Sequence, residues 1–453
     1  MADLQKALAD IVGNGNVSGA DFELVAYSRD MGPYPAKRAD VIVLPGKTEE
    51  VSEIMRYETQ TCTPVFIRGG GTGTGGMAVA RSGGILLDLC RMDKILEINE
   101  DNATITTQAG CGAYKAIKAL RKKGYRLALW PESGSSLPMG GWTSCSASGI
   151  NQYSQGYLWD SLVGLEVVLP TGEIVRTGLN AWSNCGPIGR YGATGDIQGL
   201  FEGSLGAFGV ITELTYTIYP DHEALEHVDL GFEDWEPLIK ALKLFRKTSV
   251  ITDVSFLDSA VGKLVGGNIQ IDYPLILSIG CAGTQEEAER GAAIVREIGA
   301  KVGAKDAGAP LGDILYHNAA LLNSPSFKTL GGLDDTASVG HTFDVFPEIY
   351  RVFREIVDRY QISYYWYAWV LKTCVVSFPA FAYKEPEQME DMRKAREEIS
   401  LKWREIKDVP PTTYFGPSPD FTPYLRPTYY ELLRKIKRAL DPNNILQPGL
   451  LPY

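Results

Sequence analysis

Histidine is scarce in this chain of 453 residues, which contains only four, at positions 222, 227, 317 and 341. The closest two, His222 and His227, stand one residue further apart than the H-E-x-x-H metal motif requires. A histidine-activated nucleophile and a catalytic zinc ion are therefore not expected, and no metal site is predicted. Chemistry in such a chain is expected to come from a bound organic cofactor.

Cysteine is also sparse, and its seven positions (62, 90, 111, 145, 185, 281 and 374) are scattered along the chain. Because no two of them form a C-x-x-C pair, neither a zinc site nor an iron–sulfur cluster is indicated. The cysteines are expected to be reduced and mostly buried thiols.

Excess positive charge and long apolar runs are both lacking. Lys and Arg number 44 against 55 Asp and Glu, a net charge of −11, which argues against nucleic acid or an anionic membrane as the main partner. No segment approaches the roughly 18 uninterrupted apolar residues of a membrane span. The opening M-A-D-L-Q-K-A-L-A-D is too acidic for a signal peptide. We therefore expect a cytoplasmic protein with small-molecule or protein partners.

Glycine, by contrast, is concentrated in the stretch I-R-G-G-G-T-G-T-G-G at residues 67–76, directly after the apolar run 64–66. Glycine permits positive φ and close approach of a ligand, so this loop is expected to hold an anion through its backbone N–H groups. A flexible surface loop is the alternative. A Rossmann unit is not predicted, because a strand at 85–89 follows where that motif needs a helix.

Two further glycine-rich segments follow, at 140–149 and 202–209. The first is expected to be a loop whose small hydroxyl residues line a phosphate or a heterocycle. Between the two segments, residues 165–169 and 174–177 flank the turn Pro170 to Glu173 and predict a β-hairpin. Three such segments in one α+β domain predict a ligand long enough to touch all three, such as a dinucleotide.

The region after residue 220 is expected to contain further strands and helices. Strands are predicted at 275–281 and twice within 362–383. Helices are predicted at 284–300, where Thr284 and Glu287 make a capping box, at 347–360 and at 386–403.

These motifs, taken in order, resemble those of one flavoprotein family. They are R-G-G-G-T-G-T-G-G, P-E-S-G-S-S-x-x-x-G-G at 131–141, S-A-S-G at 146–149, D-S-L-V-G-L-E-V-V-L-P-T-G-E at 160–173, G-S-L-G-A-F-G-V-I-T-E at 203–213 and L-D-P-N-N-I-L-Q-P-G at 440–449. The chain is similar to the vanillyl-alcohol oxidase and p-cresol methylhydroxylase family, to which the glycolate oxidase flavin subunit and D-lactate dehydrogenases also belong.

The resemblance implies an α+β fold with three parts. Residues 1–220 would form a two-part FAD-binding domain of the p-cresol methylhydroxylase type. Residues 221–406 would form a substrate-binding cap with an antiparallel sheet covered by helices, and residues 407–453 would return to the FAD domain.

The resemblance also implies which residues bind FAD. The first loop would wrap the pyrophosphate, the second would run along the phosphates and the isoalloxazine, and the third would pack near the adenine. The implied FAD-binding residues are Arg68, Gly69, Gly70, Gly71, Thr72, Gly73, Thr74, Gly75, Pro131, Glu132, Ser135, Gly140, Gly141, Ser144, Ser146, Gly149, Gly206, Gly209, Val210 and Ile211.

Some members of this family attach FAD covalently, through a histidine in the first loop or a histidine or tyrosine elsewhere. The first loop here contains no histidine, and Cys145 is interpreted as a small packed thiol. Non-covalent FAD is expected, and a tyrosyl link from the cap stays open.

The function is predicted from a departure from the family pattern. The 2-hydroxy-acid members carry H-A-G-D-G-N-x-H, whereas this chain has A-W-V-L-K-T-C-V-V at 368–376. Alternating aromatics at 364–369 instead suit a phenol, whose deprotonation would help hydride leave for flavin N5. The alternative is that these rings only fill the core. The candidate catalytic residues are Tyr365, Tyr367, Lys372, Tyr414 and Arg426.

Three functions remain open from the sequence. The first is an FAD-dependent dehydrogenase or oxidase of a phenolic or other aromatic substrate, with oxygen or a protein as electron acceptor. The second is a dehydrogenase of 2-hydroxy acids without the usual metal site, which would bind carboxylate through Arg426 or Lys372. The third is a flavin-binding or electron-transfer subunit without its own substrate. A homodimer or a subunit of a larger complex is expected, since dimers are common among relatives.

Overall fold

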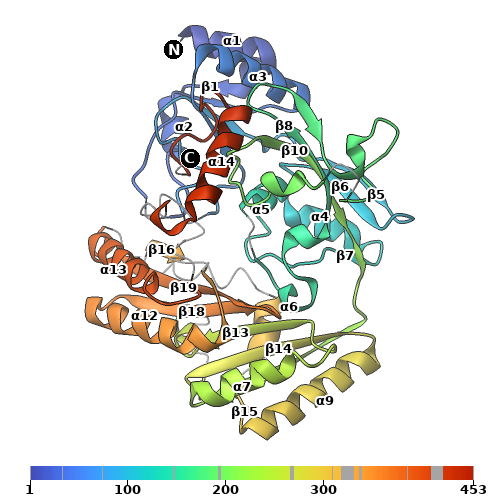
Figure 1. Cartoon of the computed structure of the whole chain (residues 1–453), viewed down its shortest axis with the longest axis vertical. Helices are drawn as coiled ribbons and strands as arrows, with labels where there is room; N and C mark the ends of the chain where they lie inside the picture. The colour runs from blue at the N-terminus through green and yellow to red at the C-terminus, as the bar shows by residue number, and fades with distance from the viewer. Residues whose placement is uncertain are drawn as a thin grey trace.

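The computed structural model places the N-terminal half of the chain and the C-terminal helix in one part and residues from about 222 to 409 in another (Figure 1). The structure describes residues 2–32, 34–73, 75–145, 148–191, 195–265, 270–308, 310–317, 331–335, 339–384, 386–409 and 422–451. The sequence predicted a mixed helix and sheet fold, and this is confirmed.

The first glycine-rich loop leaves a small, mostly parallel sheet. Its strands are β1 (Val17–Ser18), β2 (Val41–Val43), β4 (Ile85–Asp88) and β3 (Val65–Arg68), in that order across the sheet. The strands β3 and β4 are parallel neighbours, yet the connection from 69 to 84 contains no helix among its described residues. The loop therefore joins two parallel strands directly, unlike the crossover helix of a Rossmann unit.

A second, antiparallel sheet carries the predicted hairpin. It consists of β5 (Ile95–Asn99), β6 (Thr104–Gln108), β10 (Val210–Thr217), β8 (Leu162–Val168) and β9 (Ile174–Arg176). A short ladder of β7 (Tyr125–Arg126) and β11 (Tyr219–Pro220) lies beside it. The helices of this part are α1 (Ala2–Val12), α2 (Asp21–Ala26), α3 (Thr48–Thr61), α4 (Ala113–Arg121), α5 (Met139–Cys145) and α6 (Gln152–Gln155).

The second glycine-rich segment was expected to be a loop, and this expectation is wrong for its first half, which forms α5. The helix begins directly after Pro138 and packs tightly, because a Cβ at Gly140 would lie 2.6 Å from the Cβ of Ala109. Glycine thus allows close packing of this helix, which outweighs its low helix propensity.

The cap is built on one large sheet. Across the sheet the order is β15 (Lys305–Asp306), β12 (Ala224–Phe232), β14 (Leu275–Gly283), β13 (Asp253–Asp258), β18 (Ser363–Val370), β19 (Val375–Lys384) and β16 (Gly331–Asp335), and β17 (Val339–His341) also pairs with β19. All of these pairings are antiparallel. The helices are α7 (Trp235–Phe245), α8 (Ala260–Val265), α9 (Gln285–Val302), α10 (Leu311–His317), α12 (Phe346–Tyr360) and α13 (Met389–Trp403).

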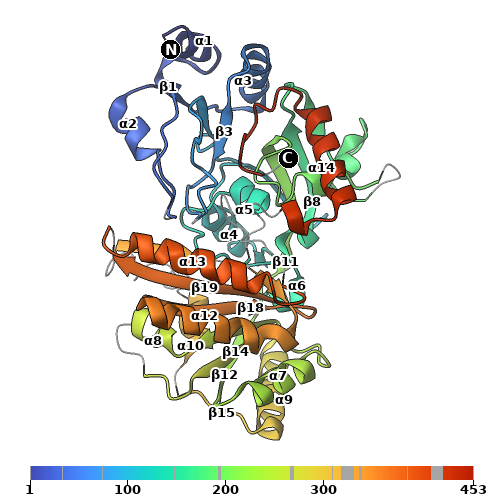
Figure 2. The ribbon, with the colours of Figure 1, turned by 60° about the vertical axis from the view of Figure 1, so that its left-hand side comes forward.

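The side chains of β18 alternate between two cores, as a strand requires. Trp366 joins the core beneath α7, α9, α12 and α13, and Figure 2 shows α12 and α13 running along β18 and β19. Tyr365, Tyr367 and Trp369 belong to the opposite core, which includes Ile150 of the FAD-side part. The odd-numbered aromatics of β18 therefore face the first domain.

The C-terminal segment returns to the first domain through α14 (Pro427–Leu440). The buried Lys437 on α14 donates to the carbonyl oxygen of Ala207 at 2.8 Å and pairs with Asp441 at 2.6 Å. After the helix, Ile445 accepts a hydrogen bond from the backbone N–H of Val65. The predicted domain limits at 220 and 406 stay predictions.

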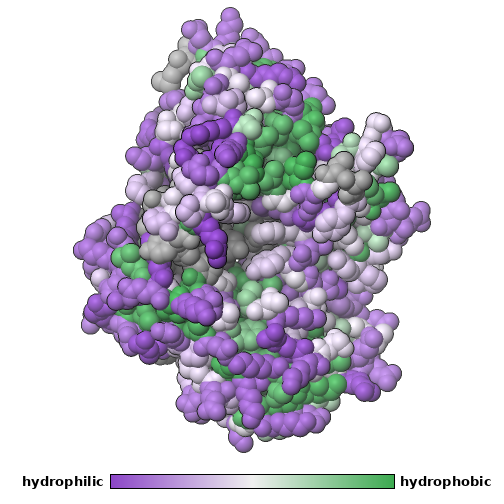
Figure 3. Space-filling view, viewed as in Figure 1, coloured by the Kyte–Doolittle hydropathy of each residue, from purple (hydrophilic) through white to green (hydrophobic). Residues whose placement is uncertain are grey.

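Hydrophilic side chains cover most of the face shown in Figure 3, with a hydrophobic area over β8 and β10 beside α14. Within the described ranges, no helix is both long enough and apolar enough to cross a membrane. Cytoplasmic localisation and the oligomeric state stay predictions.

The buried Asp258 on β13 gives the cap a testable pH dependence. Its carboxylate accepts hydrogen bonds from the backbone N–H of Trp366 and from the Tyr350 hydroxyl, both at 3.2 Å. Burial raises its pKa to about 7. A raised pKa means that the folded state holds this proton while the unfolded state has released it, so stability falls as pH rises from about 4 to 7. Asp258→Asn is expected to remove that part of the fall in urea unfolding measured across this range.

The exposed Asp272 of the same domain provides the control. Asp272→Asn should reproduce the pH profile of the unchanged protein. An Asp258→Asn profile with the same slope as the unchanged protein would show that Asp258 does not titrate in this range.

Candidate functional site

A long cleft runs through the first domain to the sheet of the cap. It contains about 1380 Å³ of empty space, open solvent included. Segments from both parts of the chain line it: the first glycine loop, residues 131–145, the third glycine segment, the strands β18 and β19, and Gln447. The cleft can take an elongated ligand.

The first glycine loop forms the middle of the cleft. A Cβ at Gly70 would overlap the carbonyl oxygen of Ser136, and Gly71 has φ +64°. Both positions therefore require glycine, one for close approach and one for backbone conformation. Among the described residues, the backbone N–H groups of Gly70, Gly71, Thr72 and Gly73 donate to no other group. They are available for an anionic ligand such as a diphosphate.

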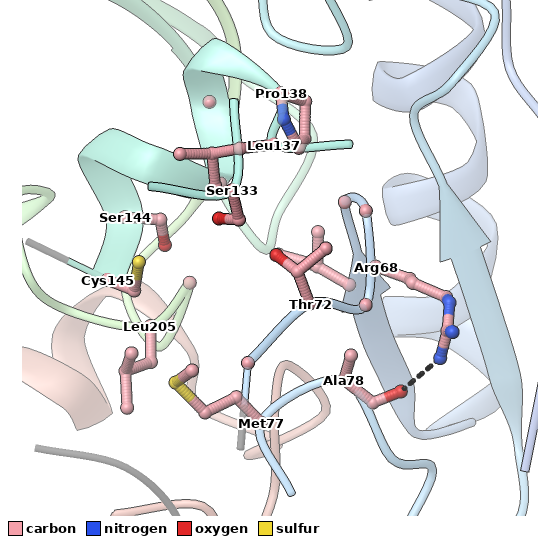
Figure 4. Close-up of a pocket in the computed structure, with 18 of the residues that line it drawn as sticks. Arg68, Thr72, Met77, Ala78, Ser133, Leu137, Pro138, Ser144, Cys145 and Leu205 are labelled. Atoms are coloured by element: carbon pink, nitrogen blue, oxygen red, sulfur yellow. Dashed lines mark hydrogen bonds between the residues drawn. The ribbon is translucent and has the colours of Figure 1, made fainter. Parts of the chain in front are cut away.

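Polar side chains of the cleft supply hydroxyls rather than cations. Figure 4 shows Thr72, Ser133 and Ser144 around one space, while the guanidinium of Arg68 turns away from it. Arg68 donates to the carbonyl oxygens of Arg29 at 3.0 Å and Ala78 at 3.4 Å. Arg68 is the only Lys or Arg among the described residues that line the cleft. Negative charge on a ligand would therefore be met mainly by backbone dipoles.

At the cap end, one carboxylate joins the two domains. Glu132 accepts a hydrogen bond from the Tyr367 hydroxyl at 3.0 Å and from the indole N–H of Trp369 at 3.1 Å. The ring of Tyr367 stacks on Phe378, with centroids 5.0 Å apart and an interplanar angle of 7°. Glu132, Tyr367 and Phe378 all line the cleft, so this end has aromatic walls and one bound carboxylate.

Most of the predicted FAD-binding residues that the structure describes line the cleft. They are Arg68, Gly69, Gly70, Gly71, Thr72, Gly73, Pro131, Glu132, Gly140, Gly141, Ser144, Gly206, Gly209 and Ile211. Gly75, Ser135, Gly149 and Val210 do not line it; Val210 is a core residue and Ser135 is exposed. Thr74 and Ser146 lie outside the described residues. The roles of all these residues stay predictions.

Of the predicted catalytic residues that the structure describes, only Tyr367 lines the cleft. Tyr365 is fully buried beside it, with ring centroids 6.2 Å apart. Lys372 is exposed between β18 and β19, with Nζ 6.0 Å from the centre of the Tyr153 ring. Arg426 is exposed at the start of α14, and Tyr414 lies outside the described residues.

Several lining residues were not predicted from the sequence. They include Asp30, Met77, Ser133, Leu137, Pro138, Cys145, Leu205, Phe378 and Gln447. Burial raises the pKa of Asp30. Phe378 could have been found, because a tight β18–β19 hairpin places it opposite Tyr367. Asp30 lies far from every motif in the sequence and carried no signal.

Two family models match the chain. Residues 39–178 match the FAD binding domain, and residues 222–407 and 419–451 match the C-terminal domain of FAD linked oxidases. The class of the protein is thus flavin-dependent oxidoreductase. The chain belongs to the FAD-linked oxidases that combine these two domains.

Named relatives agree with this assignment. Glycolate oxidase subunit GlcD of Bacillus subtilis is 26% identical over 99% of this chain and 96% of its own length. The D-lactate dehydrogenase of Anaerostipes hadrus is 29% identical over 48% of this chain and 44% of its own length. Among solved structures, p-cresol methylhydroxylase with bound substrate is similar in fold, with a TM-score of 0.84 at 18% identity, covering 99% of this chain and 96% of that one.

FAD fits the residues of the cleft. The unpaired N–H groups of the first loop suit its diphosphate, and the Gly70 position leaves no room for a side chain. The small hydroxyl residues Thr72, Ser133 and Ser144 offer donors without bulk. FAD is the cofactor, and when bound it accepts the two electrons that a substrate gives up.

Proposed function

We propose that this protein dehydrogenates a small aromatic substrate of the phenol type, at a benzylic carbon or at a carbon that bears oxygen. The observation that supports this is the cap end of the cleft, where Tyr367 and Phe378 form a stacked aromatic wall beside Glu132. A flat aromatic ring packs well against such a wall.

The residues of the cap end could also accept the proton that a phenol must lose. The Tyr367 hydroxyl donates to Glu132 at 3.0 Å, and a phenolic oxygen is an acceptor as well as a donor. A substrate hydroxyl would donate to that oxygen, and the Tyr367 proton would move toward Glu132. Loss of the phenolic proton raises the electron density of the ring and favours loss of hydride.

A 2-hydroxy acid is the second candidate, because glycolate oxidase subunit GlcD and a D-lactate dehydrogenase are similar in sequence. Its carboxylate would need a cation. The described lining residues offer only Arg68, whose guanidinium bonds to two carbonyl oxygens, and Lys372 and Arg426 are exposed. This arrangement favours the phenol over the hydroxy acid.

Anaerobic bleaching of the flavin absorbance separates these candidates. The yellow protein would be mixed in turn with a 4-alkylphenol, 4-hydroxybenzyl alcohol, D-lactate and glycolate. Bleaching by the phenols alone is the expected result. Bleaching by D-lactate or glycolate alone would overturn the proposal and make carboxylate recognition the next question. The electron acceptor, oxygen or a protein, stays a separate prediction.

Tyr367→Phe is expected to slow flavin reduction by the reactive phenol about 100-fold, the usual scale of one lost proton-transfer partner. Tyr364→Phe is the matched control, since Tyr364 lies on the same strand but its ring packs on Phe353 in the opposite core. Stopped-flow reduction rates would be compared at equal flavin content. Equal rates for both variants would remove Tyr367 from the reaction.

A further inference from the structure

Gln447 combines an unusual backbone conformation with a place in the cleft. It lies after α14 in the C-terminal segment, is 5% exposed, and lines the cleft. Its φ of +50° is uncommon for a residue with a Cβ. Such strain persists only when the surroundings fix the residue in place, and it is concentrated at functional sites.

The surroundings fix Gln447 from two sides. Its backbone N–H donates to the carbonyl oxygen of Val65 at 2.8 Å. Its side-chain Nε2 donates to the carbonyl oxygen of Leu205 at 3.0 Å. These bonds hold the amide in one orientation, with the amide nitrogen toward the third glycine segment.

The other half of the amide is left without a donor. Among the described residues, Oε1 of Gln447 is buried and accepts no hydrogen bond. A buried acceptor without a partner is unfavourable, and native proteins usually satisfy it. The donor that Oε1 lacks would therefore come from the ligand of the cleft.

The position of Gln447 identifies which end of FAD lies nearby. The redox-active ring must meet the substrate near the cap, where Tyr367 lines the cleft. The adenosine end then extends into the first domain, past the glycine loop. There the apolar Ile67 and Leu205 line the cleft, and an added Cβ at Gly206 would lie 3.6 Å from Nε2 of Gln447. Apolar walls with one polar acceptor suit a purine ring.

We propose that Gln447 recognises the adenine of FAD, with Oε1 accepting a hydrogen bond from the exocyclic amino group. That amino group is the only hydrogen-bond donor on the edge of the adenine ring. A hypoxanthine ring carries a carbonyl oxygen at the same position, which would face Oε1 as a second acceptor. Gln447 is thus a specificity-determining residue for the cofactor, independent of the substrate.

The test compares the dissociation constants of FAD and flavin hypoxanthine dinucleotide. Apo-protein from a flavin-depleted host would be titrated with each, and binding followed by flavin fluorescence. FAD is expected to bind about five- to tenfold more tightly, the scale of one neutral hydrogen bond. Equal dissociation constants would overturn the proposal whatever the substrate of the enzyme is.

Substitutions at position 447 test whether the Gln447 side chain causes the preference for FAD over the hypoxanthine analogue. Gln447→Met removes the acceptor and is expected to weaken FAD binding about five- to tenfold while leaving the analogue unchanged. Gln447→Glu keeps an acceptor oxygen, and its protonated form can donate to Leu205, so the preference for FAD should persist. If Gln447→Met weakens both ligands equally, the proposal is wrong.

Backbone strain needs its own control, because methionine tolerates positive φ poorly. Gln361 also has positive φ, at +53°, and is exposed at the end of α12. Gln361→Met should lower the melting temperature without changing either dissociation constant. If Gln447→Met does not fold, the unchanged protein and Gln447→Glu still decide: loss of the preference in Gln447→Glu would contradict the proposal.

Discussion

Gly71→Val is expected to give a folded protein that purifies with little or no FAD. Gly71 has φ +64°, and a Cβ there would overlap the guanidinium of Arg68. A β-branched residue cannot hold this conformation without strain of about 1–2 kcal/mol or more. The loop would therefore relax and turn its N–H groups away from the diphosphate. Each lost bond to a charged group costs about 1.5–3 kcal/mol, so two of them weaken FAD binding by about 100-fold or more.

The measurement is the ratio of flavin to protein absorbance, with the melting temperature of the apo-protein taken alongside. Gly124→Val is the matched control, because Gly124 has φ +77° in the same domain with nothing within 4 Å of an added Cβ. That variant should lose stability and keep FAD. A flavin-replete Gly71→Val protein would show that the first loop does not hold the cofactor by its backbone.

The first loop was predictable because its signal is local. Six glycines after an apolar run, followed by another apolar run at 85–89, require a loop between strands whatever the rest of the chain does. The structure has β3, the loop and β4 in that order. The shared face of Tyr365, Tyr367 and Trp369 was predictable for the same reason, because period-two alternation in 364–369 places every second ring on one face.

Two features of the structure depend on contacts that the local sequence does not indicate. Glycines 140 and 141 disfavour a helix locally, yet α5 forms because Ala109, which lies outside this segment, packs closely against Gly140. Lys372 comes soon after the alternating run and was assigned to the site, but it falls in the turn between β18 and β19, where it is exposed. Turn placement depends on the pairing register, which the sequence of one strand does not specify.

The motif around Glu132 predicted that it lies at the cofactor site, but it did not predict which residues Glu132 contacts. The sequence predicts it as a cofactor-binding residue beside Pro131. The structure shows its two carboxylate oxygens engaged by donors of the cap, Tyr367 and Trp369, whose positions are 235 and 237 residues away in the chain. No local sequence pattern predicts a contact between residues so far apart in the chain. This contact gives Glu132 a role that the motif alone does not suggest.

Glu132→Ala is expected to slow flavin reduction by the reactive substrate about 1,000-fold or more. The substitution removes both hydrogen bonds that orient the aromatic wall, and it also removes the acceptor for the Tyr367 proton. Loss of proton transfer alone costs about 100-fold or more, and misplacement of a positioned group by about 1 Å costs a similar factor. Stopped-flow reduction at equal flavin content would measure the rate.

Two further variants divide this effect into its parts. Trp369→Phe removes one donor and leaves Tyr367 on Glu132, so it should cost only the orientation. Glu132→Gln keeps the volume but offers one acceptor oxygen to two donors, so a proton can no longer move to a carboxylate while part of the orientation survives. If Glu132→Gln is as slow as Glu132→Ala, the carboxylate acts through the proton. If Glu132→Gln is nearly as fast as the unchanged protein, Glu132 acts only by holding the cap against the cleft, and the base for the phenol must lie elsewhere.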